Sequence, residues 1–226
     1  MTQGPRDEQM RDIHCHILPG VDDGARTLEE SLQMLEAAKW VGITAITCTP
    51  HCRDPYFDYD AMWDAFDQLR DAAGGFPLTM GFEVNYRKLM ELGMDWVRVL
   101  HTDQSADLLL ELSTNASPSR FGDYERTIFD LQGAGYHVIV AHPERYRAVQ
   151  EDMGLAEHLV DMGCDLQVSA DFVAGGRLGR EARPAKALLK RGLVTYIASD
   201  AHQPGHYGWF AKAWKRYSRF LRGEGD

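Results

Sequence analysis

The amino-acid sequence predicts an α/β protein whose parallel strands form either a barrel or a doubly wound sheet. Seven strand-like segments alternate with helical segments along most of the 226 residues. The helical segments 126–136, 154–164 and 183–193 each carry a glycine just before the next strand, as is common in repeated βα units. No linker, repeat or low-complexity tract interrupts the chain, so we expect one domain over residues 1–226, with 1–9 as a flexible N-terminal extension.

The first two strands and the first helix have clear local signals. The first strand contains DIHCH, residues 12–16. A helix is expected over 27–42, where Thr27 and Glu30 have the spacing of a capping box and apolar residues recur at helical intervals. The β-branched segment 43–51 then predicts a buried strand.

An aromatic loop separates the second strand from the second predicted helix, which spans 61–73 and ends at a pair of glycines. The aromatic residues of this region, Tyr56–Tyr59 and Trp63, either flank a binding pocket or cap the end of a barrel. Five further segments have strand character: 78–84, 107–112, 137–142, 165–170 and 193–202.

Composition narrows the function classes. The formal net charge of −10 at pH 7 would repel a phosphodiester backbone, so no nucleic-acid partner is expected. No run approaches the roughly 18 apolar residues of a membrane span, and the N-terminus is polar and acidic, unlike a secretory signal. The chain has only four cysteines, which suits a reducing compartment, and we therefore expect a cytoplasmic protein.

The DIHCH segment raises the question of metal binding. In a regular strand alternate side chains share a face, so Asp12, His14 and His16 are expected on one face and the apolar residues between and after them on the other. Leaving such polar groups unpaired in a core would cost roughly 2 to 7 kcal/mol each. Metal coordination would satisfy them, whereas an edge strand would leave the histidines solvated.

Other histidines and carboxylates also stand at the ends of predicted strands. In a parallel barrel the carboxyl ends of the strands converge on one face, where such folds keep their active sites. Each residue alone could be a turn residue or a solvated strand end, but one shared site explains eight of them at the ends of six strands better. The eight are His14, His16, His51, Glu83, Glu111, His142, Asp200 and His202.

With Asp23 added, these nine residues are too many for one tetrahedral ion and suit two or three divalent ions. Imidazole and carboxylate donors without thiolate favour manganese, iron or zinc. Adjacent ions hold a hydroxide and clamp the oxygens of an in-line phosphoryl displacement, so the residues predict metal-assisted hydrolysis. A cysteine-based phosphatase is excluded, because no cysteine is followed six residues later by an arginine.

Six motifs, in their order and spacing, resemble the PHP (polymerase and histidinol phosphatase) superfamily: HCHILPGVDDG, TPH, GFEV, LLLEL, AHPERY and IASDAH. They are most similar to the CpsB/CapC branch of bacterial manganese-dependent protein-tyrosine phosphatases. The likeness covers residues 10–207, and the first motif and HPERY are the most specific to that branch. The resemblance implies a distorted (β/α)7 barrel of the TIM type with a three-metal centre at its C-terminal face, manganese being the expected metal.

The resemblance also implies roles for single residues. Arg145 of HPERY would bind the substrate phosphate, a task that suits a guanidinium fork, and its structural alternative is a salt bridge with Glu144. After IASDAH, where relatives often carry an arginine, this chain departs from the pattern and offers His206, or a tyrosine of the same segment, as a candidate substrate contact. The implied ligand sets are His14, His16, Glu83 and Asp200 for one ion, Glu83, Glu111 and His142 for a second, and Asp23, His51 and His202 for a third.

The expected activity is hydrolysis of phosphotyrosine on a protein, by direct attack of a metal-bridging hydroxide and without a phosphoenzyme. The resemblance implies that the substrate is the tail of a tyrosine kinase of capsule or exopolysaccharide assembly, and it also allows a homo-oligomer. Two alternatives remain: a small-molecule phosphatase such as histidinol-phosphate phosphatase, and a metal-binding regulatory protein without catalysis. A nuclease role beside a DNA polymerase is disfavoured by the acidic charge balance.

Overall fold

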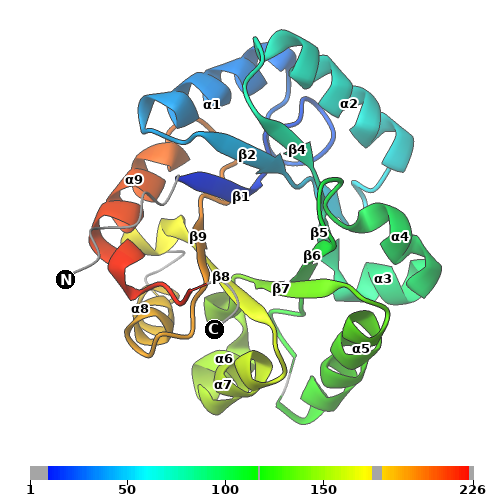
Figure 1. Cartoon of the computed structure of the whole chain (residues 1–226), viewed down its shortest axis with the longest axis vertical. Helices are drawn as coiled ribbons and strands as arrows, with labels where there is room; N and C mark the ends of the chain where they lie inside the picture. The colour runs from blue at the N-terminus through cyan, green and yellow to red at the C-terminus, as the bar shows by residue number, and fades with distance from the viewer. Residues whose placement is uncertain (1–9, 117, 175–179, 224–226) are drawn as a thin grey trace, which may run out of the picture.

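Parallel strands surrounded by helices make up the described part of the chain, residues 10–116, 118–174 and 180–223 of the computed structural model (Figure 1). The expected extension over residues 1–9 lies outside this part. The strands are β1 (Arg11–Cys15), β2 (Ala45–Cys48), β3 (His51–Cys52), β4 (Leu78–Met80), β5 (Glu83–Asn85), β6 (Asp107–Glu111), β7 (His137–Ala141), β8 (Asp165–Ser169) and β9 (Tyr196–Ala198).

Helices follow most of the strands, and none in the described residues is long and apolar enough to cross a membrane. The α-helices are α1 (Leu28–Trp40), α2 (Tyr59–Ala72), α3 (Tyr86–Leu92), α4 (Val97–Leu100), α5 (Phe121–Gly133), α6 (Arg147–Glu151), α7 (Gly154–Asp161), α8 (Ala182–Lys190) and α9 (His206–Tyr217). Short 3-10 helices are η1 (Met94–Trp96), η2 (Pro118–Arg120), η3 (Pro143–Arg145), η4 (Ala170–Ala174) and η6 (Ser218–Phe220).

The strands belong to two parallel sheets. The smaller sheet has the order β1-β2-β4 and the larger one the order β3-β5-β6-β7-β8-β9. Both curl around a common centre, and the helices lie on the outside (Figure 1). The α/β class is therefore confirmed, and the described pairing shows two curled sheets where the barrel expectation requires one continuous ring.

Breaks in two predicted strands divide the sheets. The segment 43–51 is interrupted between β2 and β3 at Pro50, which has no N–H to donate. The third predicted strand is interrupted between β4 and β5 at Gly81 and the residue after it. Hydrogen bonds still join the two interrupted strands to each other at the breaks. Gly81 N donates to Cys48 O at 2.9 Å, and Glu83 N donates to Pro50 O at 3.1 Å.

The first and last strands form a second junction. β1 and β9 meet through a parallel bridge between Cys15 and Ala201. His16 N donates to Ala201 O at 2.9 Å, and Asp200 N donates to His14 O at 2.8 Å. This junction places the histidines at the end of β1 beside the aspartate that follows β9.

Apolar side chains fill both faces of the strands. Those on the outer faces pack against the helices in one large core. Inside, Leu109, Ile139 and Ala141 form a small cluster with Ile13 and Tyr196 packed against it, which we call the interior plug. Along β6 and β7 the interior plug separates titratable residues at the amino ends of the strands from those at the carboxyl ends.

The expected alternation of DIHCH does not hold in the first part of the strand. The pairing of β1 with β2 shifts register between Asp12 and Cys15. As a consequence Ile13 packs against the interior plug, whereas Cys15 and Ile17 join the outer core. A register irregularity of this kind re-aims side chains in a way that regular alternation does not predict.

The start of α1 follows its local signals in part. Thr27 Oγ1 accepts a hydrogen bond from Glu30 N at 3.2 Å. The Glu30 carboxylate, however, accepts from Arg26 N at 2.8 Å, so only half of the capping box forms. After the last helical residue, Trp40, the chain turns at Gly42 with a φ of 97°, a left-handed conformation that favours glycine.

A charged network links three strands at their amino ends. His137 of β7 lies between Asp107 of β6 and Asp165 of β8, with N–O distances of 3.0 and 3.2 Å. Thr195 Oγ1 donates to Asp165 Oδ1 at 2.6 Å. Hydrogen bonds to Asp107 and then Asp165 raise the pKa of His137 to about 10, so the imidazolium stabilises the strand pairing over a wide pH range.

We predict that His137→Ala lowers the free energy of unfolding by about 1 kcal/mol at neutral pH. The expected loss is small because the His137 side chain is 40% exposed, so water screens its charge. Because folding raises the pKa, this stabilisation is complete below the unfolded value of about 6.5 and is lost as the pH rises through about 10. The measurement is urea unfolding of both proteins across that range. His158→Ala, outside the network, is the control, and a His137 effect that does not change with pH would contradict the account.

Candidate metal centre

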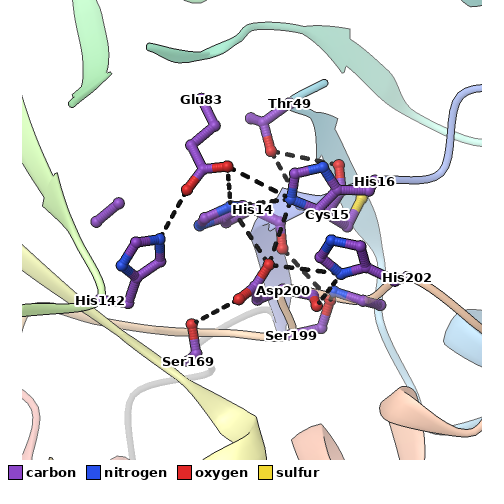
Figure 2. Close-up of polar contacts among 12 residues, drawn as sticks. His14, Cys15, His16, Thr49, Glu83, His142, Ser169, Ser199, Asp200 and His202 are labelled. Atoms are coloured by element: carbon purple, nitrogen blue, oxygen red, sulfur yellow. Dashed lines mark hydrogen bonds and ion pairs between the residues drawn. The ribbon is translucent and has the colours of Figure 1, made fainter. Parts of the chain in front are cut away.

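Eight of the nine predicted ligands gather at the carboxyl ends of the strands. Figure 2 shows His14, His16, Glu83, His142, Asp200 and His202 together. Their donor atoms form three overlapping groups, in each of which the atoms lie within 4.8 Å of one another. Convergent imidazole and carboxylate groups suit divalent transition metals. The groups are His14, His16 and Asp200; His14, Glu83 and His142; and His16, Asp23, His51 and His202.

His14 and His16 are central because each belongs to two groups. Their Nε2 atoms lie 3.3 Å apart. Asp200 Oδ1 lies 3.6 Å from His14 Nε2 and 3.3 Å from His16 Nε2. Glu83 Oε2 lies 3.6 Å from each of the same nitrogens. These four side chains therefore meet as the first implied ligand set requires.

Glu83 connects the groups through its two oxygens. Its Oε1 lies 2.7 Å from His142 Nε2, and its Oε2 lies 2.5 Å from His51 Nδ1. The second contact lacks hydrogen-bond geometry, and both of its atoms are buried without a hydrogen-bond partner. A buried carboxylate oxygen and an imidazole nitrogen held this close without a hydrogen bond fit a position for a cation.

The third group is the more exposed part of the site. Asp23 Oδ1 lies 3.1 Å from His51 Nε2 and 3.4 Å from His202 Nε2. His16 belongs to this group as well, and its ring stacks on that of His202 with the centroids 4.1 Å apart. Arg53 also approaches, with its Nη2 2.8 Å from His51 Nε2.

Glu111 is the expected ligand that the structure leaves out of the groups. It ends β6, and its Oε2 accepts a hydrogen bond from Asn85 Nδ2 at 2.8 Å. The second group accordingly contains His14 beside Glu83 and His142, in the place where the resemblance implies Glu111.

Electrostatics favour a cation at this site. Burial raises the pKa of Asp200, but Arg145 and His14 lower it well below its usual range. The pKa of Glu83 is also well below its usual range, because His14 and the other imidazoles outweigh its burial. Burial lowers the pKa of His16, yet the surrounding carboxylates raise it well above 6.5. Ionised carboxylates thus hold protons on buried histidines, and metal ions displace such protons when they bind.

Two residues of the site adopt a left-handed backbone although neither is glycine. His142 has a φ of 31° and Asp200 a φ of 48°. Such conformations cost of order 1 to 3 kcal/mol each and persist where the surrounding structure enforces them. Both residues stand just past a strand, His142 after β7 and Asp200 after β9, so the turn aims each side chain into the site.

Arg145 reaches the site from η3. Its Nη2 lies 2.5 Å from Asp200 Oδ2 and 3.3 Å from Asp171 Oδ2. The alternative of a salt bridge with Glu144 is wrong, because the buried Glu144 carboxylate accepts a hydrogen bond from Ser169 N instead. The Arg145 side chain stays 28% exposed, so the same guanidinium that contacts Asp200 is open to a bound ligand.

His206 lies beside the third group at the start of α9. Its Nδ1 accepts a hydrogen bond from His202 N at 3.3 Å. Its ring stacks on Trp209 with the centroids 4.5 Å apart. These contacts fix the His206 ring at the edge of the site.

The aromatic residues near α2 have different surroundings. Tyr56 stacks on His51, with ring centroids 5.8 Å apart, and so borders the site. Tyr59 stacks on the buried Phe82, and Trp63 packs edge-on against Tyr59. Tyr56 therefore flanks the site, whereas Tyr59 and Trp63 pack toward the core.

Sequence reasoning missed the residue that orients His16. Asp22 Oδ2 lies 2.9 Å from His16 Nδ1 in a hydrogen bond that fixes the ring. The loop folds back closely on β1, because a Cβ on Gly24 would lie only 2.0 Å from His16 O. The signal was the DDG sequence itself, in which Asp22 positions His16 and Asp23 joins the third group.

Sequence reasoning also missed two residues of β8 that bond to side chains of the site, Gln167 and Ser169. Gln167 Oε1 lies 2.9 Å from His14 Nδ1, and Ser169 Oγ donates to Asp200 Oδ2 at 3.1 Å. Asp165, Gln167 and Ser169 occupy alternate positions of DLQVS. Polar residues at every second position of a buried strand are a readable sign that its inner face meets a polar site.

The four cysteines are free and buried. Burial raises the pKa of Cys52 and of Cys164 to about 12, and it raises that of Cys15 further above the usual range. A reactive thiolate is therefore not available at neutral pH, in agreement with the exclusion of a cysteine nucleophile from the sequence.

Comparison with known proteins links this fold and site to one family. The family model described as capsular polysaccharide synthesis, CpsB/CapC, matches residues 10–208. Tyrosine-protein phosphatase YwqE of Bacillus subtilis is 34% identical over 200 residues, which cover 85% of this chain and 77% of that protein.

Structural comparison points the same way. One crystal structure comes from a study of YwqE from Bacillus subtilis and CpsB from Streptococcus pneumoniae, described as unique metal-dependent tyrosine phosphatases. It aligns with this chain with a TM-score of 0.76 and 28% identity, and the alignment covers 93% of this chain and 89% of the other. More distantly, a protein named "Probable histidinol-phosphatase" from Deinococcus radiodurans is 26% identical over 217 residues, covering 80% of this chain and 83% of that one.

We predict that Asp22→Asn weakens divalent-metal binding about 10- to 100-fold, because an amide in place of the carboxylate no longer orients His16 or supports its charge. The measurement is titration of chelator-stripped protein with manganese by calorimetry. Asp165→Asn, a buried aspartate that contacts a histidine at the opposite end of the strands, is the matched control and should bind normally. Equal affinities for both variants would contradict the role given to Asp22.

Proposed function

Because the chain belongs to the CpsB/CapC family of capsular polysaccharide synthesis, we propose that it is a metal-dependent protein-tyrosine phosphatase. The observation that carries this proposal is the convergence of eight histidine and carboxylate side chains at the strand ends beside a partly exposed arginine. A phosphotyrosine is a dianionic monoester, and an arrangement of cations with a guanidinium fork suits its hydrolysis.

The donor set fits two or three divalent ions, with manganese as the proposed metal. His14, His16, Glu83 and Asp200 would hold one ion, and Asp23, His51 and His202 would hold another, since their donor atoms already lie close together. The second implied set would need a Glu111 oxygen beside His142 and Glu83, whereas in the structure Glu111 Oε2 accepts a hydrogen bond from Asn85. When bound, such ions supply an activated water and neutralise charge on the phosphate oxygens.

The other side chains of the site position groups and bind phosphate. Asp22 and Gln167 hold the His16 and His14 rings through their Nδ1 atoms, leaving both Nε2 atoms directed into the site. Arg145 would offer its guanidinium to the equatorial phosphate oxygens. Because Arg145 also contacts Asp200, the group that would bind the phosphate lies directly beside a proposed metal ligand.

We propose that the two sheets and their helices form a single domain with the shape of one barrel. Hydrogen bonds at both junctions between the sheets support a distorted (β/α)7 barrel formed by one domain. We further propose a phosphotyrosine protein of capsule assembly as the substrate, such as the tail of a tyrosine kinase. A cytoplasmic location and assembly into a homo-oligomer complete the proposal.

A second candidate function rests on the similarity to the protein named "Probable histidinol-phosphatase". The same ligands and Arg145 would serve an aliphatic phosphomonoester. Tyr56, stacked on His51 at the edge of the site, favours an aryl phosphate, since a phenyl ring can pack against it.

We predict that chelator-stripped protein is inactive and that manganese restores phosphate release from a phosphotyrosyl peptide. His14→Ala should lose at least about a thousandfold in kcat, because both groups that contain its Nε2 are broken. The same assay with histidinol phosphate separates the two candidates. Restored activity on histidinol phosphate alone would overturn the tyrosine phosphatase proposal, and inactivity on both substrates would favour a metal-binding regulatory protein.

We also predict that Arg145→Lys raises KM for the phosphopeptide and lowers kcat/KM about 10- to 100-fold, since an ammonium group cannot form the bidentate contact with phosphate. Arg147→Lys, two residues later and 71% exposed on α6, is the control and should behave as wild type. Steady-state kinetics with manganese-loaded proteins measure the effect. A kcat/KM for Arg145→Lys equal to that of wild type would rule out phosphate binding by Arg145.

A further inference from the structure

A second region of the molecule has a charge opposite to that of the whole chain. Residues 182–223 contain nine of the 24 lysines and arginines but only one of the 34 aspartates and glutamates. Glu224 and Asp226, which follow, lie outside the described residues. In a chain of net charge −10, this segment is a local concentration of positive charge.

The cations of this segment line a hollow between α8, η4 and the end of α9. The hollow has a volume of about 560 Å³, and we call it the cationic groove. Val173 and Tyr217 line it as well, and a smaller hollow beside it adds Lys190 and Phe220. The charged side chains of the cationic groove are Lys186, Lys212, Lys215, Arg216 and Arg219.

These charges are not neutralised within the described residues. None of the five forms an ion pair there, whereas Arg26, Arg53, Arg147 and others on the remaining surface do. The guanidinium of Arg216 lies over the Tyr217 ring at 5.4 Å, and that of Arg219 lies over the Phe220 ring at 4.9 Å. The rings hold the guanidinium groups in place, which makes the groove a prepared site for anionic groups.

The cationic groove is connected to the candidate metal centre by two elements. In η4, Asp171 contacts Arg145, and Val173 lines the groove two residues later. In α9, His206 lies beside the third ligand group, and Lys215 follows nine residues later, about 14 Å along the axis at 1.5 Å per residue. About four to five residues of an extended chain would cover that distance.

We propose that the cationic groove binds an acidic segment of the protein substrate while its phosphotyrosine occupies the metal centre, a role that rests on the proposed function. Carboxylates about four to six residues from the phosphotyrosine would reach the lysines and arginines of the groove. A concave site with aromatic residues suits an extended polypeptide, which can place side chains inside it.

An anionic membrane surface is the less suitable occupant. A bilayer is flat on the scale of the groove, and peripheral binding commonly adds apolar side chains to the basic ones. The exposed large apolar residues of the described chain lie on or beside other helices, α1 and α3 to α5: Trp40, Met90, Met94, Val99 and Phe129.

Two phosphotyrosyl peptides test the proposal on the full-length, manganese-loaded protein. One carries glutamates four to six residues from the phosphotyrosine on both sides, and the other carries glutamines at the same positions. We expect a KM about five- to tenfold lower for the acidic peptide at low salt, and a smaller difference as salt is raised. A triple variant of the groove, Lys212→Glu, Lys215→Glu and Arg216→Glu, should abolish the difference while leaving kcat on p-nitrophenyl phosphate unchanged.

A control of equal charge change separates local from global electrostatics. Arg70→Glu, Arg98→Glu and Arg126→Glu change exposed residues on α2, α4 and α5 by the same total charge, and this protein should keep the preference. Equal KM values for the two peptides on active wild-type enzyme would overturn the groove proposal. Loss of the preference in both triple variants would overturn it too, because the effect would then be due to net charge.

Binding measured without catalysis distinguishes failure of this proposal from failure of the proposed function. Fluorescence anisotropy of a labelled, unphosphorylated acidic peptide should report binding that the groove variant loses and the control keeps. Such binding in a protein without phosphatase activity would support the groove and refute the phosphatase. Binding of phosphatidylserine vesicles that depends on the groove, without binding of the acidic peptide, would assign the surface to a membrane and overturn the proposal.

Discussion

Two carboxylates that the fold removes almost completely from water, Glu83 and Asp200, impose the constraint on which the site depends. They are 1% and 6% exposed, and a buried charge of this kind is unstable unless opposite charge surrounds it. Histidines from three other chain segments, His202 beside Asp200, and Arg145 provide that charge. β1, β5, β7 and β9 must therefore end at the same place, and the junction of β1 with β9 ensures this for the first and last strands.

The remaining polar contacts follow from the same constraint. Asp22, Gln167 and Ser169 each bond to a side chain of the ligand set, so the ligands are held before any substrate arrives. The interior plug separates this cluster from the Asp107, His137 and Asp165 network at the amino ends of the strands. One end of the strands is thus a neutralised, stabilising network. The other end offers carboxylates and imidazoles to cations and a guanidinium to an anionic substrate.

Local sequence signals predicted the order of the elements and nine candidate ligands, eight of which cluster at the strand ends. A polar residue at the end of an apolar strand stands out without any tertiary knowledge. The breaks at Pro50 and Gly81 and the register shift in β1 depend on how neighbouring strands pair, which one segment does not reveal. The contact of Arg145 with Asp200 also joins residues far apart in sequence. The cationic groove was not predicted for a similar reason, since only the fold brings Lys186 of α8 to the cations of α9 and η6.

The central claim, that the buried histidines and carboxylates exist to hold divalent ions, is tested most directly by anomalous diffraction at the manganese edge from crystals of manganese-loaded protein. The account predicts strong anomalous peaks among the donor atoms of His14, His16, Glu83 and Asp200, and a further peak between Asp23, His51 and His202. A protein that hydrolyses phosphotyrosine in the same preparation but shows no peak among these residues would contradict it.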